Sequence, residues 1–170
     1  EKFLFVTYHP VTLEYEQTEM QIKELLTALD VIGLPVLFTM PNADTGGRVI
    51  RKLIGEFLPK HPDSKKVENL GTQGYFSAMA LATAMVGNSS SGIVETASFG
   101  LTVVNVGNRQ KGRMRGQNVI DVGCNREEIV DGIRKAISPE FRASLKGLIN
   151  PYGKGQAAEI ILNKLKRVEL

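Results

Sequence analysis

Short apolar segments alternate with amphipathic segments along nearly the whole of this 170-residue chain. The apolar segments have the length of buried strands, and most of the amphipathic segments repeat their apolar residues at helical spacing. Strands that are separated by helices run parallel, because each helix carries the chain back across the sheet before the next strand begins. The expected strands are residues 2–7, 36–40, 66–70, 84–86, 102–106 and 118–122. The sequence therefore predicts the α/β class, with a doubly wound parallel sheet covered by helices on both sides.

The expected helices lie between and after these strands. The clearest spans residues 14–32, where Ile22, Leu25 and Leu29 recur on one face. Asn125 could cap another helix, because its short side chain can accept a hydrogen bond from a free backbone N–H. The remaining helices are expected near residues 50–57, 75–83, 93–99 and 156–168. No internal repeat or linker divides the chain, so we expect one domain over residues 1–170.

Composition excludes several kinds of protein. A content of 42% hydrophobic and 23% charged residues is typical of a soluble globular chain. No apolar run approaches the roughly 18 residues of a membrane span, so we expect no membrane partner. The single cysteine, Cys124, cannot form an internal disulfide, which fits a cytoplasmic protein. Because the two histidines and this cysteine are widely spaced, we expect no metal site. We also expect no cofactor.

The basic residues gather in one short segment. The formal net charge of +3 is too small to indicate a nucleic-acid partner, and no aromatic residue lies between the cations of residues 109–115. The arginine guanidinium presents a fork that matches phosphate oxygens. We therefore expect one arginine, Arg109, Arg113 or Arg115, to contact an anionic small molecule, and the others to be exposed or to bind a partner.

The loops that follow the strands hold most of the unusual chemistry. In a doubly wound sheet the ligand binds at the carboxyl ends of the strands, so these loops face one site. They are residues 8–10, 41–47, 71–74, 88–92 and 107–116.

Residues 87–95, with the sequence GNSSSGIVE, join an expected strand to an expected helix. Such a turn can aim backbone N–H groups and hydroxyls at a phosphate, which makes Ser89, Ser90, Ser91 and Gly92 candidate ligand residues. The alternative is that Ser91 caps the helix and the glycines form the turn. Glu95, one turn later, could accept hydrogen bonds from ribose hydroxyls or complement the helix dipole.

Other candidates are less specific on their own. His9 could reach a diphosphate or protonate a leaving oxygen, or it could be structural. Asn42 and Asp44 could bind a sugar, although both residue types favour turns. Tyr75 could stack on a base, but an aromatic residue at the start of a helix often belongs to the core.

Four segments together resemble a known family. They are TYHPVT over residues 7–12, FTMPNAD over 38–44, GNSSSGIVE over 87–95, and VNVGNRQ over 104–110 with GR at 112–113. In this order and spacing they are similar to the hydrolysing UDP-N-acetylglucosamine 2-epimerases, most nearly the sialic-acid-pathway branch. The resemblance spans essentially the whole chain.

The resemblance implies the Rossmann-like C-terminal half of a GT-B fold, which binds UDP and UDP-N-acetylglucosamine. His9 and Arg109 would meet the diphosphate, Ser89 and Ser90 the phosphates, and Glu95 the ribose. His9 would also act on the leaving-group side of the reaction. The remaining UDP-site positions that the resemblance implies are Asn42, Asp44, Leu70 and Gly71, the last two at the uracil edge, with Tyr75, Ser91 and Gly92 nearby.

The implied reaction eliminates UDP and then adds water to release N-acetylmannosamine. Its carboxylates would lie in an N-terminal domain, so we expect this chain, which starts at Glu1 inside a strand, to be an inactive fragment of a homo-oligomeric enzyme. Two alternatives stay open, namely the donor-binding domain of a GT-B glycosyltransferase and a non-catalytic nucleotide-sugar sensor.

Overall fold

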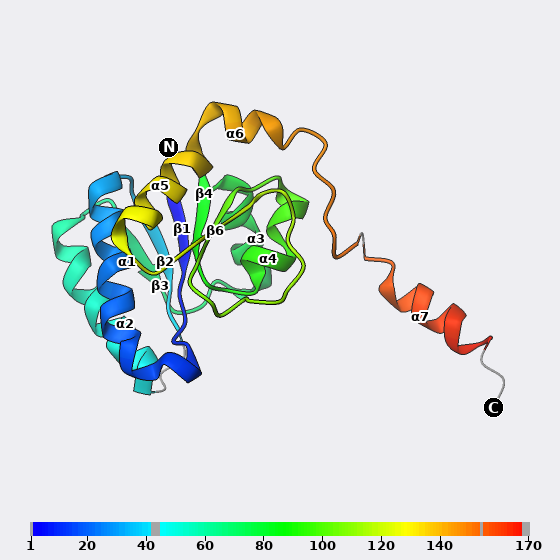
Figure 1. Ribbon diagram of the computed structural model, residues 1–170, viewed down its shortest axis with the longest axis horizontal. Coiled ribbons are helices and arrows are strands. Elements are labelled where there is room, and N and C mark those ends of the chain that lie inside the picture. The colour runs from blue at the N-terminus through cyan, green and yellow to red at the C-terminus, as the bar shows by residue number, and fades with distance from the viewer. Residues whose placement is uncertain (1, 42–44, 154, 168–170) are drawn as a thin grey trace.

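A six-stranded parallel sheet forms the centre of the computed structural model, which describes residues 2–41, 45–153 and 155–167 (Figure 1). The strands follow the order β3-β2-β1-β4-β5-β6, and every pair of neighbours is parallel. Their bounds are β1 Leu4–Thr7, β2 Val36–Thr39, β3 Lys65–Val67, β4 Ala84–Gly87, β5 Val103–Val106 and β6 Val119–Val122. The predicted class and all six predicted strands are confirmed. The strand order reverses between β1 and β4, which places the topological switch point there.

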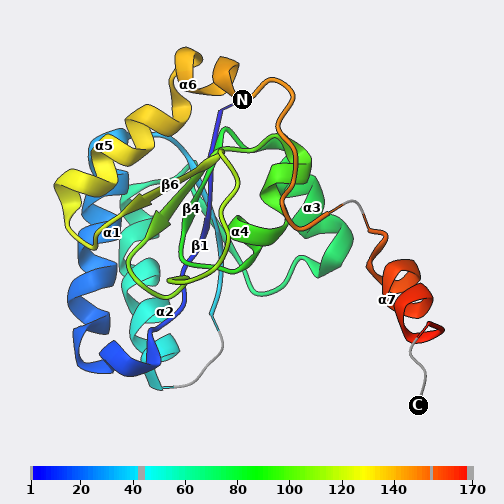
Figure 2. The same cartoon turned by 45° about the vertical axis from the view of Figure 1, so that its right-hand side comes forward.

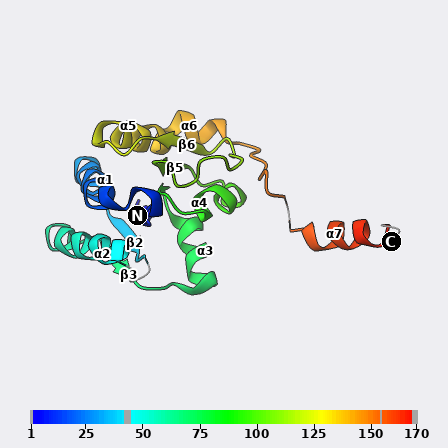
Figure 3. The same ribbon diagram turned by 60° about the horizontal axis from the view of Figure 1, so that its bottom comes forward.

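Helices cover both faces of the sheet (Figure 3). One face carries α1, α2 and α5, which pack side by side, and the other carries α3 with the short helices α4 and η3. The bounds on the first face are α1 Thr18–Ile32, preceded by η1 Thr12–Gln17, then α2 Thr45–Phe57, followed by η2 Leu58–Lys60, and α5 Arg126–Ile137. On the second face they are α3 Gly71–Leu81, α4 Ser91–Val94 and η3 Thr96–Phe99.

The core consists of one apolar layer on each side of the sheet. In the larger layer, Ile22, Leu25 and Leu29 of α1 are buried against the strands, as their spacing predicts. Burying one such side chain is worth about 1.5–3 kcal/mol, so this layer holds α1 on the sheet. In the smaller layer, Phe5 of β1 packs with Met79 of α3.

Two loop predictions were wrong. Residues 71–74 do not form a loop but begin α3, with Leu70 at its N-cap. Gly71 has φ of 61° and its N–H donates to Asn69 Oδ1 at 2.7 Å. Gly46 and Gly47 likewise lie inside α2 rather than in the preceding loop. Glycine is a poor helix former, so the sequence pattern placed both helix starts too late.

The C-terminal part also differs from the prediction. An additional helix, α6 Pro139–Ser144, follows α5, and Asn125 caps α5 as expected by accepting from Glu128 N. The last helix is α7 Ala157–Leu165, which lies away from the sheet in every view (Figures 1, 2 and 3). Its Ile161 is 58% exposed, so its apolar face is not packed on the body. Within the described ranges, no helix combines the length and the apolar character needed to cross a membrane.

Candidate functional site

The ends of β1 and β4 approach each other closely at the switch point. Gly87, the last residue of β4, has φ of 138°, and a Cβ atom added to it would lie 2.1 Å from the carbonyl oxygen of Thr7. No side chain fits in that space, and L residues rarely adopt this φ. A glycine is therefore required where β4 turns into the serine-rich segment.

The serine turn, residues 88–92, forms a tight connection into α4. Helix α4 begins at Ser91 and has Ser90 as its N-cap, with no side-chain cap hydrogen bond, so capping by Ser91 is not what the structure shows. A Cβ atom on Gly92 would lie 3.1 Å from Val103 Cγ1, so this glycine lets α4 pack close to the sheet. Since α4 is only one turn long, its dipole is small. The N–H groups of Ser89 and Ser90 donate to no acceptor among the described residues, and they remain available to a ligand.

A chain of hydroxyl groups connects the turn to the strand ends. Ser89 Oγ lies 2.9 Å from Ser91 Oγ, and Ser91 Oγ lies 2.6 Å from the Tyr75 hydroxyl. The Tyr75 hydroxyl lies 3.2 Å from Thr7 Oγ1, which in turn lies 2.6 Å from Thr39 Oγ1. Sequence reasoning missed Thr7 and Thr39, although each is the last residue of its strand. These hydrogen bonds hold the side chains of Ser89 and Ser91 in place.

Asn88 joins three of the strand-end loops. It is fully buried, and its side chain accepts from the backbone N–H of His9 and donates to the His9 carbonyl, both at 2.8 Å. Its own carbonyl accepts from Arg109 Nη1 at 3.0 Å and from Gln110 Nε2 at 2.8 Å. Sequence reasoning did not single out Asn88, although it stands between Gly87 and Ser89. His9, the serine turn and Arg109 are thus brought together, as expected from their loops.

Arg109 is the arginine of the basic segment that reaches the serine turn. Partial burial and the charge of Arg113 lower the pKa of its guanidinium, which nevertheless stays charged at neutral pH. Apart from the bond to Asn88, its guanidinium has no acceptor among the described residues. Arg109 therefore presents free donors beside the free N–H groups of Ser89 and Ser90.

Glu95 follows α4 and carries a carboxylate oxygen, Oε2, that is buried and has no hydrogen-bond partner among the described residues. Burial raises the pKa of this carboxyl above its usual range. A buried carboxylate oxygen without a donor is unfavourable in the free protein. Glu95 as a whole is only half-buried, so a ligand that brings hydroxyl donors to the carboxylate would offset part of that cost.

The other predicted site residues have more varied surroundings. The Tyr75 ring packs edge-on against Phe5, with centroids 4.9 Å apart, so Tyr75 contributes to the core through its ring and to the serine turn through its hydroxyl. Leu70 packs against the smaller core layer, and Gly71 is exposed at the start of α3. Asn42 and Asp44 lie outside the described residues.

One sizeable cavity lies away from this site. A cavity of about 640 Å³ opens at the opposite end of the strands and is lined by Lys2, Phe3, Leu37, Asp63 and Lys65 among others. It has none of the converging donors of the serine turn, and the Lys65 ammonium donates to the Pro62 carbonyl. No group of His, Cys, Asp and Glu within the described ranges could hold a metal ion.

Comparison with known proteins agrees with this fold. The family model described as UDP-N-acetylglucosamine 2-epimerase matches residues 1–166. The chain is 38% identical over 170 residues to the UDP-N,N'-diacetylbacillosamine 2-epimerase (hydrolyzing) of Legionella pneumophila, covering 99% of this chain and 44% of that protein. It is 42% identical over 139 residues to the GDP/UDP-N,N'-diacetylbacillosamine 2-epimerase (hydrolyzing) of Campylobacter jejuni, covering 81% of this chain and 36% of that protein.

A solved structure of S. aureus MnaA with UDP superimposes with a TM-score of 0.76 at 20% identity, covering 98% of this chain and 44% of the other. This likeness shows that the fold is the Rossmann-like half of a GT-B fold. The chain spans less than half the length of the relatives that it matches. Because the family model matches nearly every residue, the chain belongs to the UDP-N-acetylglucosamine 2-epimerase family.

Proposed function

We propose that this chain is the UDP-binding half of a hydrolysing 2-epimerase that acts on a UDP-linked 2-acetamido sugar. One observation carries the proposal: the unpaired N–H groups of Ser89 and Ser90 directly follow Asn88, whose carbonyl binds Arg109, and the unpartnered Oε2 of Glu95 lies one turn further along. Donors for a diphosphate and an acceptor for hydroxyls are what a nucleoside diphosphate needs. The structure of S. aureus MnaA with UDP, which has the same fold, supports the proposal.

The proposal assigns a role to each candidate. The N–H groups of Ser89 and Ser90 bind phosphate oxygens, and Arg109 neutralises the diphosphate. Glu95 accepts from the ribose hydroxyls. His9, which Asn88 holds through both backbone groups, lies on the leaving-group side. Asn42 and Asp44 are assigned to the sugar side, and the backbone of Leu70 and Gly71 to the uracil edge.

The chemistry gives these donors a catalytic purpose. In the proposed first step a base removes the C2 proton of the sugar, the C1–O bond breaks, and UDP leaves with the electron pair, so that a glycal remains. In the second step water adds across the C1–C2 double bond. Its hydroxyl goes to C1, and a proton is delivered to C2 on the face opposite to the one from which the first proton was removed. Negative charge grows on UDP as the bond breaks, and fixed donors around the diphosphate stabilise it. The base and acid belong, on this proposal, to the remainder of the full-length protein.

The sugar is a separate part of the proposal. The motifs predict UDP-N-acetylglucosamine, with N-acetylmannosamine as the product. The relatives at 38% and 42% identity are named for diacetylbacillosamine, whereas the UDP-N-acetylglucosamine 2-epimerase of Neisseria meningitidis is 30% identical over 133 residues. We therefore add UDP-N,N'-diacetylbacillosamine as a second candidate substrate, and the two sugars differ in the substituents at C4 and C6.

The deciding experiment uses the full-length protein with each nucleotide sugar in turn. We expect release of UDP together with the free 2-epimerised sugar, detected by coupled assay and mass spectrometry. Transfer of the sugar to an acceptor, without the free epimer, would instead indicate a glycosyltransferase. UDP binding without turnover of any nucleotide sugar would indicate a sensor. Either result contradicts the epimerase proposal.

Calorimetry on the 170-residue chain tests the binding site itself. We expect weak UDP binding, because a two-domain site closes over its ligand from both sides. Arg109→Ala and Glu95→Ala should each weaken it by at least about 1 kcal/mol, as expected for the loss of a charged hydrogen bond. Arg134→Ala and Glu140→Ala, on exposed positions of α5 and α6, are the matched controls. Unchanged affinity in both site variants would remove the proposed site.

A further inference from the structure

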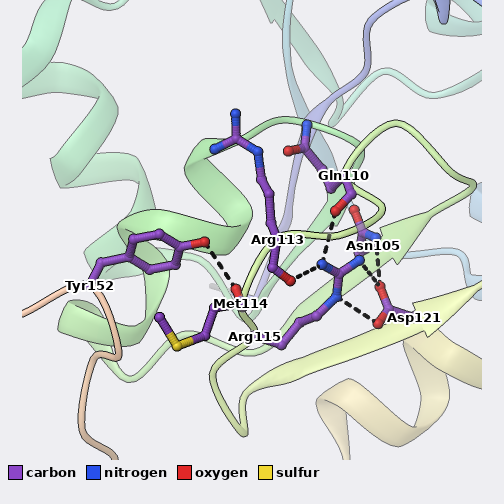
Figure 4. A network of polar contacts seen from close by, with 7 residues as sticks. All are labelled: Asn105, Gln110, Arg113, Met114, Arg115, Asp121 and Tyr152. Carbon is purple, nitrogen blue, oxygen red and sulfur yellow. Dashed lines mark hydrogen bonds and ion pairs between the residues drawn. The ribbon is translucent and has the colours of Figure 1, made fainter.

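Arg115 differs from the other cations of the basic segment. Its side chain is turned inward and is 25% exposed, whereas Lys111 and Arg113 are exposed. Its guanidinium binds Asp121 with two bonds, Nε to Oδ2 at 2.9 Å and Nη2 to Oδ1 at 3.2 Å (Figure 4). Its Nη1 donates to the carbonyls of Gln110, at 2.9 Å, and Arg113. The prediction that the remaining arginines are exposed or bind a partner is therefore wrong for Arg115.

Asp121 fixes the Arg115 guanidinium to the sheet. It lies on β6 directly opposite Asn105 on β5, and Asn105 Nδ2 donates to Asp121 Oδ1 at 2.6 Å (Figure 4). Burial alone would raise the pKa of Asp121, but the hydrogen bonds from Arg115 and Asn105 and the charge of Arg115 bring it below its usual range. The carboxylate is thus held in one position and stays charged at neutral pH.

The Arg115 guanidinium restrains the backbone of residues 110–113, which follow Arg109. Arg115 gathers the Gln110 and Arg113 carbonyls, which limits how the backbone of residues 110–113 can run. Gln110, which is 3% exposed, then donates its side-chain amide to the carbonyl of Asn88. Arg109 donates to that same carbonyl. A continuous series of bonds therefore leads from β6 through Arg115 and Gln110 to the serine turn.

We infer that Arg115 and Asp121 are positioning residues, which hold residues 109–113 so that Arg109 can bind the diphosphate of a nucleotide. Neither residue needs to contact the ligand, since the Nε, Nη1 and Nη2 atoms of Arg115 each already donate a hydrogen bond within the protein. Bidentate arginine–carboxylate pairs give geometric definition that a lysine cannot reproduce. The inference rests on the proposed UDP site and adds the pair that orients it.

The test compares ligands with and without the diphosphate. Arg115→Met removes the fork, and Asp121→Asn removes the charge with little change of shape. We expect each to weaken UDP binding to the 170-residue chain about 10-fold and uridine binding less than about twofold, because only the diphosphate depends on Arg109. Arg115→Lys should fall between the parent and Arg115→Met. Arg134→Met is the control for loss of an arginine, and circular dichroism confirms that each variant folds.

A double-mutant cycle separates positioning from general stability. Because Arg115 acts through Arg109, Arg115→Met in an Arg109→Ala background should cost less than about twofold in UDP affinity. A full 10-fold loss in that background, or equal losses for UDP and uridine, would overturn the inference. So would unchanged UDP affinity in both Arg115→Met and Asp121→Asn when Arg109→Ala weakens binding. A parent chain that binds no UDP would instead refute the proposed site, and the positioning role with it.

Discussion

The buried carboxylate oxygen of Glu95 shows how a ligand site can raise the free energy of the unliganded protein. Glu95 Oε2 has no donor among the described residues, and burial raises the pKa of the carboxyl. A group whose folded pKa lies above its unfolded value contributes stability below the unfolded pKa, about 4.3, and loses it as pH rises through the folded pKa. At neutral pH the ionised Glu95 therefore opposes folding. The residue is retained, on our proposal, for the ribose.

The first prediction follows from this conflict between stability and binding. Glu95→Gln removes the charge and should stabilise the free chain at pH 7 by a few tenths of a kcal/mol, a small value because the group is partly exposed and screened. The same change should weaken UDP binding. Urea unfolding at pH 7 and at pH 4, with calorimetry for UDP, checks both effects. The stabilisation should shrink at pH 4, where Glu95 is increasingly protonated, and a constant difference would contradict the argument.

The second prediction concerns the close contact at the end of β4. Gly87→Ala would place a Cβ atom 2.1 Å from the Thr7 carbonyl oxygen, so β1 and β4 must separate. We expect a loss of about 3 kcal/mol or more in the free energy of unfolding, measured with urea. Gly55→Ala is a matched control in α2, where a Cβ atom meets nothing within 4 Å. That variant should be neutral or more stable, by up to about 1 kcal/mol, since alanine favours helix.

At the scale of elements, strands were easier to predict than helix starts. All six strands are short apolar segments bounded by polar residues or turns, and burial in a parallel sheet requires that pattern. The starts of α2 and α3 were missed because glycines stand there, and glycine indicates a turn unless a tertiary contact decides otherwise. α6 was missed because six residues give no clear period.

The candidate site was predictable for the same physical reason, up to a limit. Strand-end loops converge in a doubly wound sheet, so His9, the serine turn and Arg109 could be grouped without coordinates. The loop pattern alone did not distinguish Arg109 from Arg115, and only the family resemblance selected Arg109. Their roles are separated by Asp121, which is brought near Arg115 by the β5–β6 register. The role of Asn88 in joining the loops could not be predicted from the sequence either, because it depends on contacts with residues of other loops.

A third prediction belongs to the start of α5. Asn125 Oδ1 accepts from Glu128 N at 2.9 Å, while the Glu128 carboxylate accepts from Gly123 N at 2.6 Å and from the Asn125 amide. Asn125→Ala should destabilise the chain by about 1 kcal/mol, as loss of an N-cap does. Thermal unfolding measures this loss, with Asn125→Ser as a variant that keeps a capping oxygen. A Ser variant as unstable as the Ala variant would contradict the capping role.

The pH dependence of this cap has a definite sign. The hydrogen bonds from Gly123 and Asn125 lower the pKa of Glu128 below its usual range. A group with a lowered folded pKa contributes stability above its unfolded pKa, about 4.3, and loses that contribution as pH falls through the folded pKa. Titration of Glu128 by NMR should therefore give a midpoint below about 4.3, and Asn125→Ala should raise it.

At the scale of the whole molecule, α7 stands apart from the body. Ile160 is 63% exposed, Ile161 58% and Leu165 63%. An exposed apolar group of this kind is typical of a surface that binds a partner. The chain also spans less than half the length of the relatives that it matches.

A fourth prediction tests whether α7 contributes to the fold of this chain. The triple change Ile160→Ser, Ile161→Ser and Leu165→Ser should leave the midpoint of urea unfolding of the body unchanged, because these side chains are already exposed. The matched control is Ile22→Ser, Leu25→Ser and Leu29→Ser on α1, which should unfold the chain because those residues are buried. A clear loss of stability from the α7 changes would mean that α7 packs on the body in solution.

The segment before α7 is tied to the site at two points. Asn150 Nδ2 donates to the carbonyl of Val94, the neighbour of Glu95, at 2.9 Å, and the Tyr152 hydroxyl donates to the carbonyl of Met114 at 3.1 Å (Figure 4). Met114 lies between Arg113 and Arg115. Residues 150–152 are therefore bonded beside the ribose side and beside the diphosphate side of the proposed site, through separate side chains. A displacement of this short segment would therefore act on both sides of the proposed site at once.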